Sequence, residues 1–541
     1  MSLRRFSRIG FIALFVFAAG IADASSLPSK LGKIEFPTSG SREVQRHFLR
    51  GVAALHSFWY EEGLEAFRQS TKVDPHFVMG YWGEAMAHNH PLWEQQDAQA
   101  AKEALAKVKD ITKVTARERA YLDAVTLLYG KGDKRSRDEA YSHAMEKVHR
   151  DYPEDLEAAC FYALSLLGVA RNSDNKFPLQ VQAGAIGLDV FRQNPDHPCA
   201  AHYTIHAFDH PDLAILALPA ARRYAQIAPA SHHAQHMPAH IFVQLGLWPE
   251  AAAANEAGWR NSVAWVEREH LSKGQRGYHS LQWLHYVYLQ QGRYEKADAV
   301  FQLKLKDMID ASIDAQAQDS KTIRRVGKYY ERMAGAMVFE RERWELAATL
   351  KEPPGWEPKS YAQAVLTFVR GFAAAMLGRA DADRHLADLN AIRSQGFAKN
   401  YFKRPERLDI WDLEIQAAIR VSNKDYEEAI ALMKKATAIE EKLPAPSGPP
   451  RLIKPTYELF GEILLRAGKP QEAAQQFATS LLRHPNRARS LLGAARAAAD
   501  NGDREEAVEW YSKLLAVWTQ ADPTLPELQE ARRYLKKEST P

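Results

Sequence analysis

Histidine residues are concentrated in one part of this sequence. Eleven of the twenty histidines lie between residues 197 and 285. His202 and His206 are four residues apart, and His236 and His240 repeat that spacing further along the chain. On an α-helix this spacing places two imidazole rings on one face, which is an arrangement used by helical metal sites. Neutral imidazole is a common ligand of zinc, copper, nickel and iron.

The two histidine pairs therefore predict a transition-metal site, with zinc or copper as the expected ion. Further histidines at the end of an earlier predicted helix are added to the candidate ligands. Asp209 is either another ligand or an acceptor that fixes the tautomer of a ligand. His232 and His233 are expected in an exposed loop after Pro229. The candidate ligands are His202, His206, His236, His240, His88 and His90.

A structural role is the alternative for all of these histidines, because imidazoles on packed helices commonly stack on aromatic rings. No His-Glu-x-x-His, Gly-x-Ser-x-Gly or phosphate-loop motif accompanies them. Cys199 precedes His202 by three residues, but nothing marks the third group of a nucleophilic site. The sequence therefore assigns no catalytic residue and no cofactor-binding residue, and it favours a binding protein over an enzyme.

The elements that must position these residues are short helices in a repeat. Three residues near the carboxyl terminus, Gly468, Ala473 and Phe477, recur 34 residues later as Gly502, Ala507 and Tyr511. A period of 34 is typical of helical hairpins that bury their apolar faces only by stacking on neighbours. The predicted fold class is all-α, a solenoid of helical hairpins.

The pattern divides the chain into an amino-terminal array with the histidine-rich region at 42–310, degenerate helical repeats at 311–405, and a carboxyl-terminal array with a capping helix at 406–541. Two proline-rich segments, 353–358 and 443–450, interrupt the helices. For the second we expect an insertion on the convex side, with a ligand-contacting loop as the alternative.

Residues 1–24 read as a cleaved secretory signal, because three arginines precede a short apolar run and an Ala-x-Ala site. Residues 25–41 are expected to be a linker. The apolar run is shorter than the ~20 residues that span a bilayer, so no stable membrane span is expected after cleavage. The expected location is periplasmic or secreted. In such an oxidising compartment Cys160 and Cys199 form either a disulfide or two buried thiols.

The formal net charge of +4 argues against nucleic acid as the partner, because nucleic-acid proteins concentrate Lys and Arg on one face. Aromatic residues are frequent, at 10% of the chain. Most should pack between helices, and a minority are free to line a groove for a peptide.

The glycine, alanine, aromatic and proline spacing resembles the tetratricopeptide-repeat (TPR) superfamily, above all at 50–75, 281–301 and 457–515. His202–Asp209 and His236–Phe242 are also similar to segments of large secreted bacterial repeat proteins. The resemblance implies a right-handed superhelix whose concave groove holds a protein or peptide partner. The expected function is an exported scaffold for such a partner; the alternative is a periplasmic metal-binding protein or metal-dependent enzyme.

Overall fold

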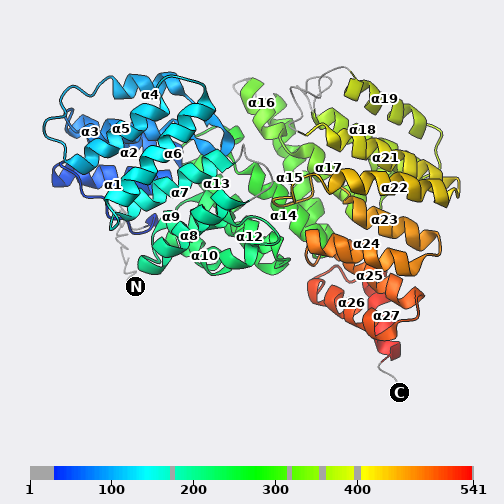
Figure 1. Ribbon diagram of the computed structural model, residues 1–541. Coiled ribbons are helices and arrows are strands. Elements are labelled where there is room, and N and C mark those ends of the chain that lie inside the picture. The colour runs from blue at the N-terminus through cyan, green and yellow to red at the C-terminus, as the bar shows by residue number, and fades with distance from the viewer. Residues whose placement is uncertain (1–29, 171–176, 314–319, 353–360, 395–403, 539–541) are drawn as a thin grey trace, which may run out of the picture.

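The computed structural model describes residues 30–170, 177–313, 320–352, 361–394 and 404–538. Helices dominate these ranges, and consecutive helices pack as antiparallel hairpins side by side (Figure 1). The predicted all-α solenoid of helical hairpins is thus confirmed. The proposed signal segment 1–24 and the proline-rich segment 353–358 lie outside the described residues.

Five hairpins of two helices each form the amino-terminal array. Their bounds are α1 Arg42–His56, α2 Tyr60–Val73, α3 Val78–Ala87, α4 Ala98–Leu105, α5 Ala116–Leu128, α6 Lys134–Asp151, α7 Leu156–Ala170, α8 Pro178–Gln193, α9 Pro198–Ala207 and α10 Ala214–Ile227. Between α3 and α4 lie the short strands β1 Asn89–His90 and β2 Gln95–Gln96, with the 3₁₀ turn η3 Pro91–Trp93 between them.

Small residues let the helices of successive hairpins approach each other. Phe67 of α2 is fully buried. A Cβ atom on Gly51 of α1 would lie 2.6 Å from the Phe67 ring, and one on Gly83 of α3 would also collide with it. One aromatic ring therefore fills the space that glycines leave on both neighbouring helices.

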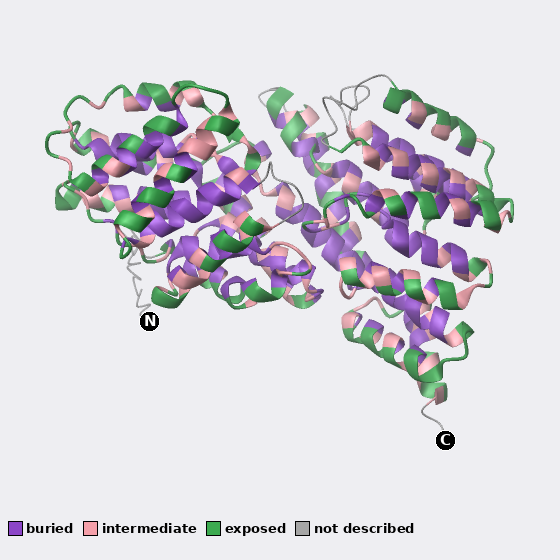
Figure 2. Cartoon of the chain, in the orientation of Figure 1, coloured by how far each residue is buried: buried purple, intermediate pink, exposed green. Residues whose placement is uncertain are grey.

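The first helix of each hairpin, here called a front helix, is α1, α3, α5, α7 or α9. The row of front helices curves so tightly that α1 meets α9. The His56 imidazole on α1 and the Tyr203 hydroxyl on α9 are 2.9 Å apart. The space between the front helices is filled by rings of α1, α3, α5 and α7: Trp82 lies 5.6 Å from Tyr121 and 5.3 Å from Phe161, between ring centroids. The interior of this array is therefore an aromatic core. Figure 2 shows the long buried stretches of its helices.

The described part of the predicted linker, residues 30–41, packs against this array. The Leu31 and Phe36 side chains are buried in it. The Lys33 amide donates a hydrogen bond to the Asp196 carbonyl, 2.9 Å away, at the start of α9. These apolar side chains anchor the segment, so it is part of the fold.

Cys160 of α7 and Cys199 of α9 form a disulfide, with their Cα atoms 6.0 Å apart. The sequence left open whether these cysteines form a disulfide or stay as two buried thiols. The structure has the disulfide, between neighbouring front helices. The disulfide covalently links α7 to α9, the helix that carries the candidate ligands His202 and His206.

The central helices carry the chain from the first array to the second. Their bounds are α11 His232–His236, α12 Pro238–Gln244, α13 Trp248–Arg268, α14 Tyr278–Gln290, α15 Tyr294–Ile313, α16 Ser320–Gly327 and α17 Tyr330–Glu340, with 3₁₀ turns η4 Lys273–Gln275 and η5 Trp344–Thr349.

The carboxyl-terminal helices curve back onto α14 (Figure 1). They are α18 Tyr361–Met376, α19 Ala382–Ser394, α21 Glu406–Ser422, α22 Tyr426–Glu440, α23 Thr456–Arg466, α24 Pro470–Arg483, α25 Ala488–Asp500, α26 Arg504–Val517 and α27 Pro526–Glu538. The Ala488 amide bonds the Gln290 side chain, and the Trp518 indole donates to the Gln290 carbonyl, at 3.1 and 3.0 Å. The last hairpins therefore close against the middle of the chain.

The proline-rich segment 443–450 is not an insertion on the convex side, so that expectation is wrong. The Gln244 side-chain amide donates to the Pro446 carbonyl at 2.8 Å. Gly448 lies directly against the Trp283 ring, where a side chain would collide. The loop packs on α12 and α14, because its prolines and glycine offer a flat surface to an aromatic ring. The loop therefore borders the helices of the histidine-rich region.

Among the described residues, every helix falls short of the length and apolar character needed to cross a bilayer.

Candidate metal centre

Three histidines from α9 and α11 bring their ring nitrogens together. The Nε2 atom of His202 lies 3.1 Å from Nε2 of His206 and 3.1 Å from Nε2 of His233. In a tetrahedral site with metal–nitrogen bonds of about 2.0–2.1 Å, ligand nitrogens are roughly 3.3 Å apart. These three side chains, which we call the first cluster, each place a ring nitrogen within 4.8 Å of the other two, close enough to share one ion.

Hydrogen bonding fixes the tautomer of His202. Its Nδ1 atom donates to the His56 backbone carbonyl at 2.6 Å, so the Nε2 atom carries the lone pair. Burial lowers the pKa of His202 to about 3, which keeps the ring neutral. One lone pair cannot accept two strong hydrogen bonds, from both His206 and His233. A cation between the three nitrogens would satisfy all of them.

His233 is not in an exposed loop, so that expectation is wrong. It lies in α11, where the Ser231 side chain accepts a hydrogen bond from the Ala234 amide and caps the helix. His233 lies three residues before His236 and seven before His240. Separations of three and seven residues place side chains on one face of a helix. The sequence therefore did offer a signal for His233 as a candidate ligand.

A second cluster consists of His236, His240 and His279, from α11, α12 and α14. One ring nitrogen of each lies within 4.8 Å of the other two. His236 donates from Nδ1 to the Asn255 side-chain oxygen at 2.7 Å, and His240 does so to Asp209 at 2.7 Å. Both rings therefore present Nε2 lone pairs.

Two ring nitrogens of the second cluster are buried without a hydrogen-bond partner in the described chain. They are Nε2 of His236 and Nδ1 of His279. Burial lowers the pKa of His236 to about 3, and it lowers the pKa of His279 well below its usual value. An unpaired, buried nitrogen costs free energy unless a ligand occupies it. The donor set therefore fits a cation.

An aromatic ring covers each cluster. Phe58 lies 4.3 Å from His202, between ring centroids, and is stacked on His206 at 5.5 Å. Its backbone φ of 53° is in the left-handed region, which is rare for a bulky residue and recurs at functional sites. Trp283 lies 4.3 Å from the His240 ring and 5.2 Å from that of His236. These rings limit the access of water.

The two clusters adjoin each other. The ring centroids of His206 and His240 are 6.2 Å apart, and those of His233 and His236 are 6.5 Å apart. The four histidines predicted from the spacing do lie together, but they divide between two clusters. Each cluster is completed by a histidine, His233 or His279, that the spacing analysis did not select.

The other candidates lie outside both clusters. His90 stacks on Tyr60, with ring centroids 3.8 Å apart, and His88 caps the end of α3. Asp209 is held by His240 and by Gln244, which donates to its other oxygen at 3.1 Å. It takes the role of an acceptor that orients a candidate ligand.

A third group, of His56, His197 and Glu157, is already satisfied internally. The Glu157 carboxylate accepts hydrogen bonds from His56 at 2.6 Å and from His197 at 3.1 Å. Burial alone would raise the pKa of Glu157, but attraction to these two imidazoles and their hydrogen bonds lower it to about 2. This group also orients the first cluster, because the His56 backbone carbonyl accepts the hydrogen bond from His202.

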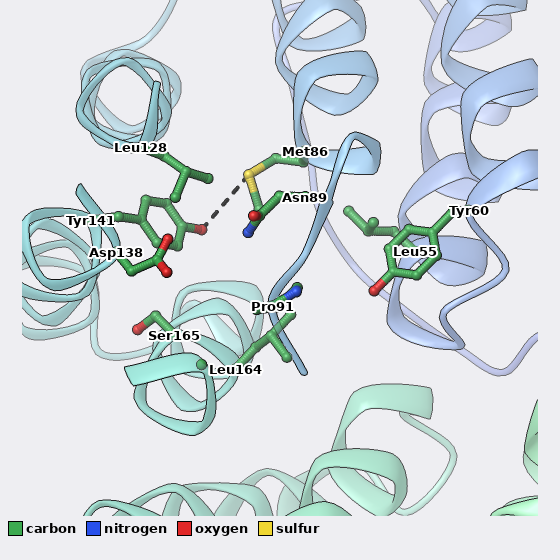
Figure 3. Close-up of a pocket in the computed structure, with 11 residues that line it drawn as sticks. Leu55, Tyr60, Met86, Asn89, Pro91, Leu128, Asp138, Tyr141, Leu164 and Ser165 are labelled. Carbon is green, nitrogen blue, oxygen red and sulfur yellow. Dashed lines mark hydrogen bonds between the residues drawn. The ribbon is translucent and has the colours of Figure 1, made fainter. Parts of the chain in front are cut away.

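The closed cavity drawn in Figure 3 is not the site. Its volume is about 20 Å³, room for about one water molecule, and apolar groups dominate its lining. Tyr141 donates its hydroxyl to the Met86 sulfur there, 3.8 Å away. The cavity lies within the packed helices of the amino-terminal array.

The two clusters together offer a set of neutral nitrogen donors. Such donors suit zinc, copper, nickel and iron. Each cluster supplies three protein ligands, and three-ligand sites leave a position for water or substrate, as in catalytic rather than structural zinc sites.

The repeat residues and a family comparison identify the architecture. Residues 459–526 match the tetratricopeptide-repeat model. A Cβ atom on Gly461 of α23 would lie 2.7 Å from Phe477 of α24, and Gly468 and Gly502 turn at φ of 71° and 81° between paired helices. Residues 459–526 therefore carry tetratricopeptide repeats. TPR proteins typically bind other proteins.

Solved structures give more distant likenesses. Human IFIT1, in a dimer with m7Gppp-AAAA, is 13% identical with a TM-score of 0.30, over 92% of this chain and 95% of that one. The Cut9–Hcn1 assembly is 13% identical with a TM-score of 0.29, over 92% and 96%. Yeast Tom70 is 10% identical with a TM-score of 0.23, over 92% and 90%. Among curated proteins no match was found.

Proposed function

We propose that this TPR protein is an exported transition-metal protein with a dinuclear histidine centre. The first cluster, His202, His206 and His233, would hold one ion, and the second cluster would hold another. The observation that carries the proposal is that the Nε2 atoms of His206 and His233 each lie 3.1 Å from Nε2 of His202, whose tautomer is fixed by a backbone carbonyl.

Zinc and copper are the ions that this centre would take. All six donors are imidazoles, which suit both ions, and no carboxylate of the described chain belongs to either cluster. A bound ion would supply Lewis acidity or, for copper, electron transfer. The protein would orient the rings, keep them neutral and shield them with Phe58 and Trp283. Because three protein ligands would leave a position on each ion for water or substrate, the proposal includes metal-dependent catalysis.

Export is part of the same proposal. It is supported by the signal-like residues 1–24 and by the disulfide between Cys160 and Cys199, a bond that persists in oxidising compartments. A periplasmic location would also expose the clusters to metal ions without the reducing thiols of the cytosol.

Metal content per chain tests the proposal. The untagged mature protein, purified from the periplasm and dialysed against zinc or copper, should contain about two ions by elemental mass spectrometry. His206→Ala and His279→Ala should each remove one ion, and the double variant should remove both. His143→Ala, at an exposed histidine of α6, is the control and should keep both.

The proposal is wrong if the reconstituted protein holds no metal, or if both cluster variants keep the same content as the control. Circular dichroism of each variant establishes that a lost ion is not simply a lost fold.

A protein or peptide partner is the second candidate function. It is supported by the TPR repeats at 459–526 and by exposed apolar side chains on the second helix of a hairpin, Ile215 and Leu216 of α10. An Ile215→Glu/Leu216→Glu variant should then lose a partner that the wild-type chain captures, with unchanged metal content. Equal capture by both chains would exclude this surface.

A further inference from the structure

A large open cavity lies beside the histidine centre, on the far side of the proline-rich loop 443–450. Its volume is about 840 Å³, which is within the range of small-molecule sites. Five arginines line it, against two glutamates, and they come from α17, α21, α24 and the stretches that flank these helices. The arginines are Arg332, Arg404, Arg407, Arg451 and Arg483.

Among the residues that the structure describes, most of this positive charge has no ion-pair partner. Arg483 pairs with Glu440 at 3.5 Å and Arg332 approaches its neighbour Glu331 at 3.6 Å. Within the described chain, the ion pairs include none for Arg404, Arg407 or Arg451. The Nε atom of Arg332 is buried without a hydrogen-bond partner in the same part of the chain.

Burial and the crowding of guanidinium groups lower the pKa of two of these arginines. Arg451 reaches the cavity, yet the protein around it and the repulsion from Arg332 lower its pKa to about 10. Burial likewise lowers the pKa of Arg407, with a contribution from Arg332 and Arg404. Like charges held this close cost free energy that a bound anion would recover.

The cavity and the second cluster share their walls. Loop 443–450 lines the cavity and at the same time packs on Trp283 and Gln244, beside His240. On the other side, Tyr329 lies between them: its ring is 5.6 Å from the His279 ring and 5.4 Å from the Arg332 guanidinium carbon. One aromatic residue therefore separates Arg332 from His279.

We propose that this arginine-lined cavity binds a small polyanion that carries phosphate or carboxylate groups, and that this anion is the substrate or co-ligand of the adjoining histidine centre. The second part rests on the proposed function. Guanidinium groups bind both kinds of oxyanion through paired hydrogen bonds, and five of them around one cavity exceed what a single charge needs. Tyr361 adds an aromatic wall.

Calorimetric titration of the metal-free mature protein with pyrophosphate and with citrate tests the cavity separately from the metal. At least one probe should bind, and Arg407→Gln/Arg451→Gln should weaken it by about tenfold or more. Arg192→Gln/Arg420→Gln, with the same loss of charge at exposed sites away from the cavity, should bind as the wild type does.

Failure of both probes to bind, or equal affinity of the two double variants, would overturn the anion site whatever the metal content proves to be. The link to the metal is tested with the cobalt- or copper-loaded protein. Saturation with the bound probe should change its visible absorption spectrum, and an unchanged spectrum would overturn the assignment of the anion to the histidine centre.

Discussion

At the scale of single residues, the account depends on how each imidazole is held. His202 donates to a backbone carbonyl, His236 to Asn255 and His240 to Asp209, and each bond turns a lone pair toward its cluster. Such supporting bonds set both the orientation and the basicity of a ligand.

Asp209→Asn should weaken metal binding at the second cluster by about 10–100-fold, because the amide is a poorer acceptor for the His240 ring. Competition with a chelator of known affinity measures the effect. Asp212→Asn, an exposed carboxylate on the same stretch of chain, serves as the control and should leave the affinity unchanged. Equal affinities in both variants would show that Asp209 does not support a ligand.

Glu157→Gln should destabilise the protein by about 3–5 kcal/mol, because two buried imidazoles lose their anionic partner. The effect should depend on pH. The folded-state pKa of about 2 lies below the ordinary 4.5, so the unfolded chain binds more protons between these values. The stabilisation by Glu157 is therefore complete above pH 4.5 and is lost as the pH falls toward 2.

Urea unfolding of the wild type and of Glu157→Gln across that pH range checks this sign. The difference in unfolding free energy should shrink as the pH falls. The exposed Glu154→Gln should show no such trend, and a constant difference for Glu157→Gln would contradict the assignment.

At the scale of elements, glycines and aromatic rings set the helix spacing. Gly461→Ala should destabilise by about 1–3 kcal/mol, because its methyl group would meet the Phe477 ring. Gly63→Ala in α2 is the matched substitution with ordinary contacts of 3.5 Å or more, and it should stabilise by up to about 1 kcal/mol. Thermal unfolding distinguishes the two, and a shift of the same sign in both would contradict this packing account.

The helices themselves were largely predictable. The repeat spacing around Gly51, Phe67 and Pro75 predicts helices over about 43–57 and 60–73, and α1 and α2 span Arg42–His56 and Tyr60–Val73. The spacing of four also placed His202 and His206 on one face. His279 was not predictable in this way, because it joins its cluster from α14, across a contact between helices that local periodicity does not encode.

At the scale of the whole molecule, buried charges join the last hairpins to the middle of the chain. The Arg487 guanidinium donates hydrogen bonds to Glu458 at 2.8 and 2.9 Å and to the Tyr286 hydroxyl at 2.9 Å, and it forms an ion pair with Glu340 at 2.7 Å. This closure also brings the cavity and loop 443–450 beside α14. Sequence spacing could not reveal it, since it depends on the summed curvature of many hairpins.

Arg487→Ala should cost about 3–5 kcal/mol of unfolding free energy, because it removes the ion-pair partner of the buried Glu340 and leaves the buried Glu458 with Lys454 and Ser490 alone. Arg504→Ala, at an exposed position of α26, should cost little. Urea unfolding measures both. A loss below about 1 kcal/mol for Arg487→Ala would mean that the closure of the molecule does not depend on this network.

The most direct test of the central claim is anomalous diffraction from crystals of the mature protein loaded with zinc or copper. The account predicts two strong anomalous peaks per chain. One should lie about 2.0–2.2 Å from Nε2 of His202, His206 and His233, and the other at that distance from a ring nitrogen of each member of the second cluster. The absence of a peak at both clusters, in crystals whose metal content is established by fluorescence, would contradict it.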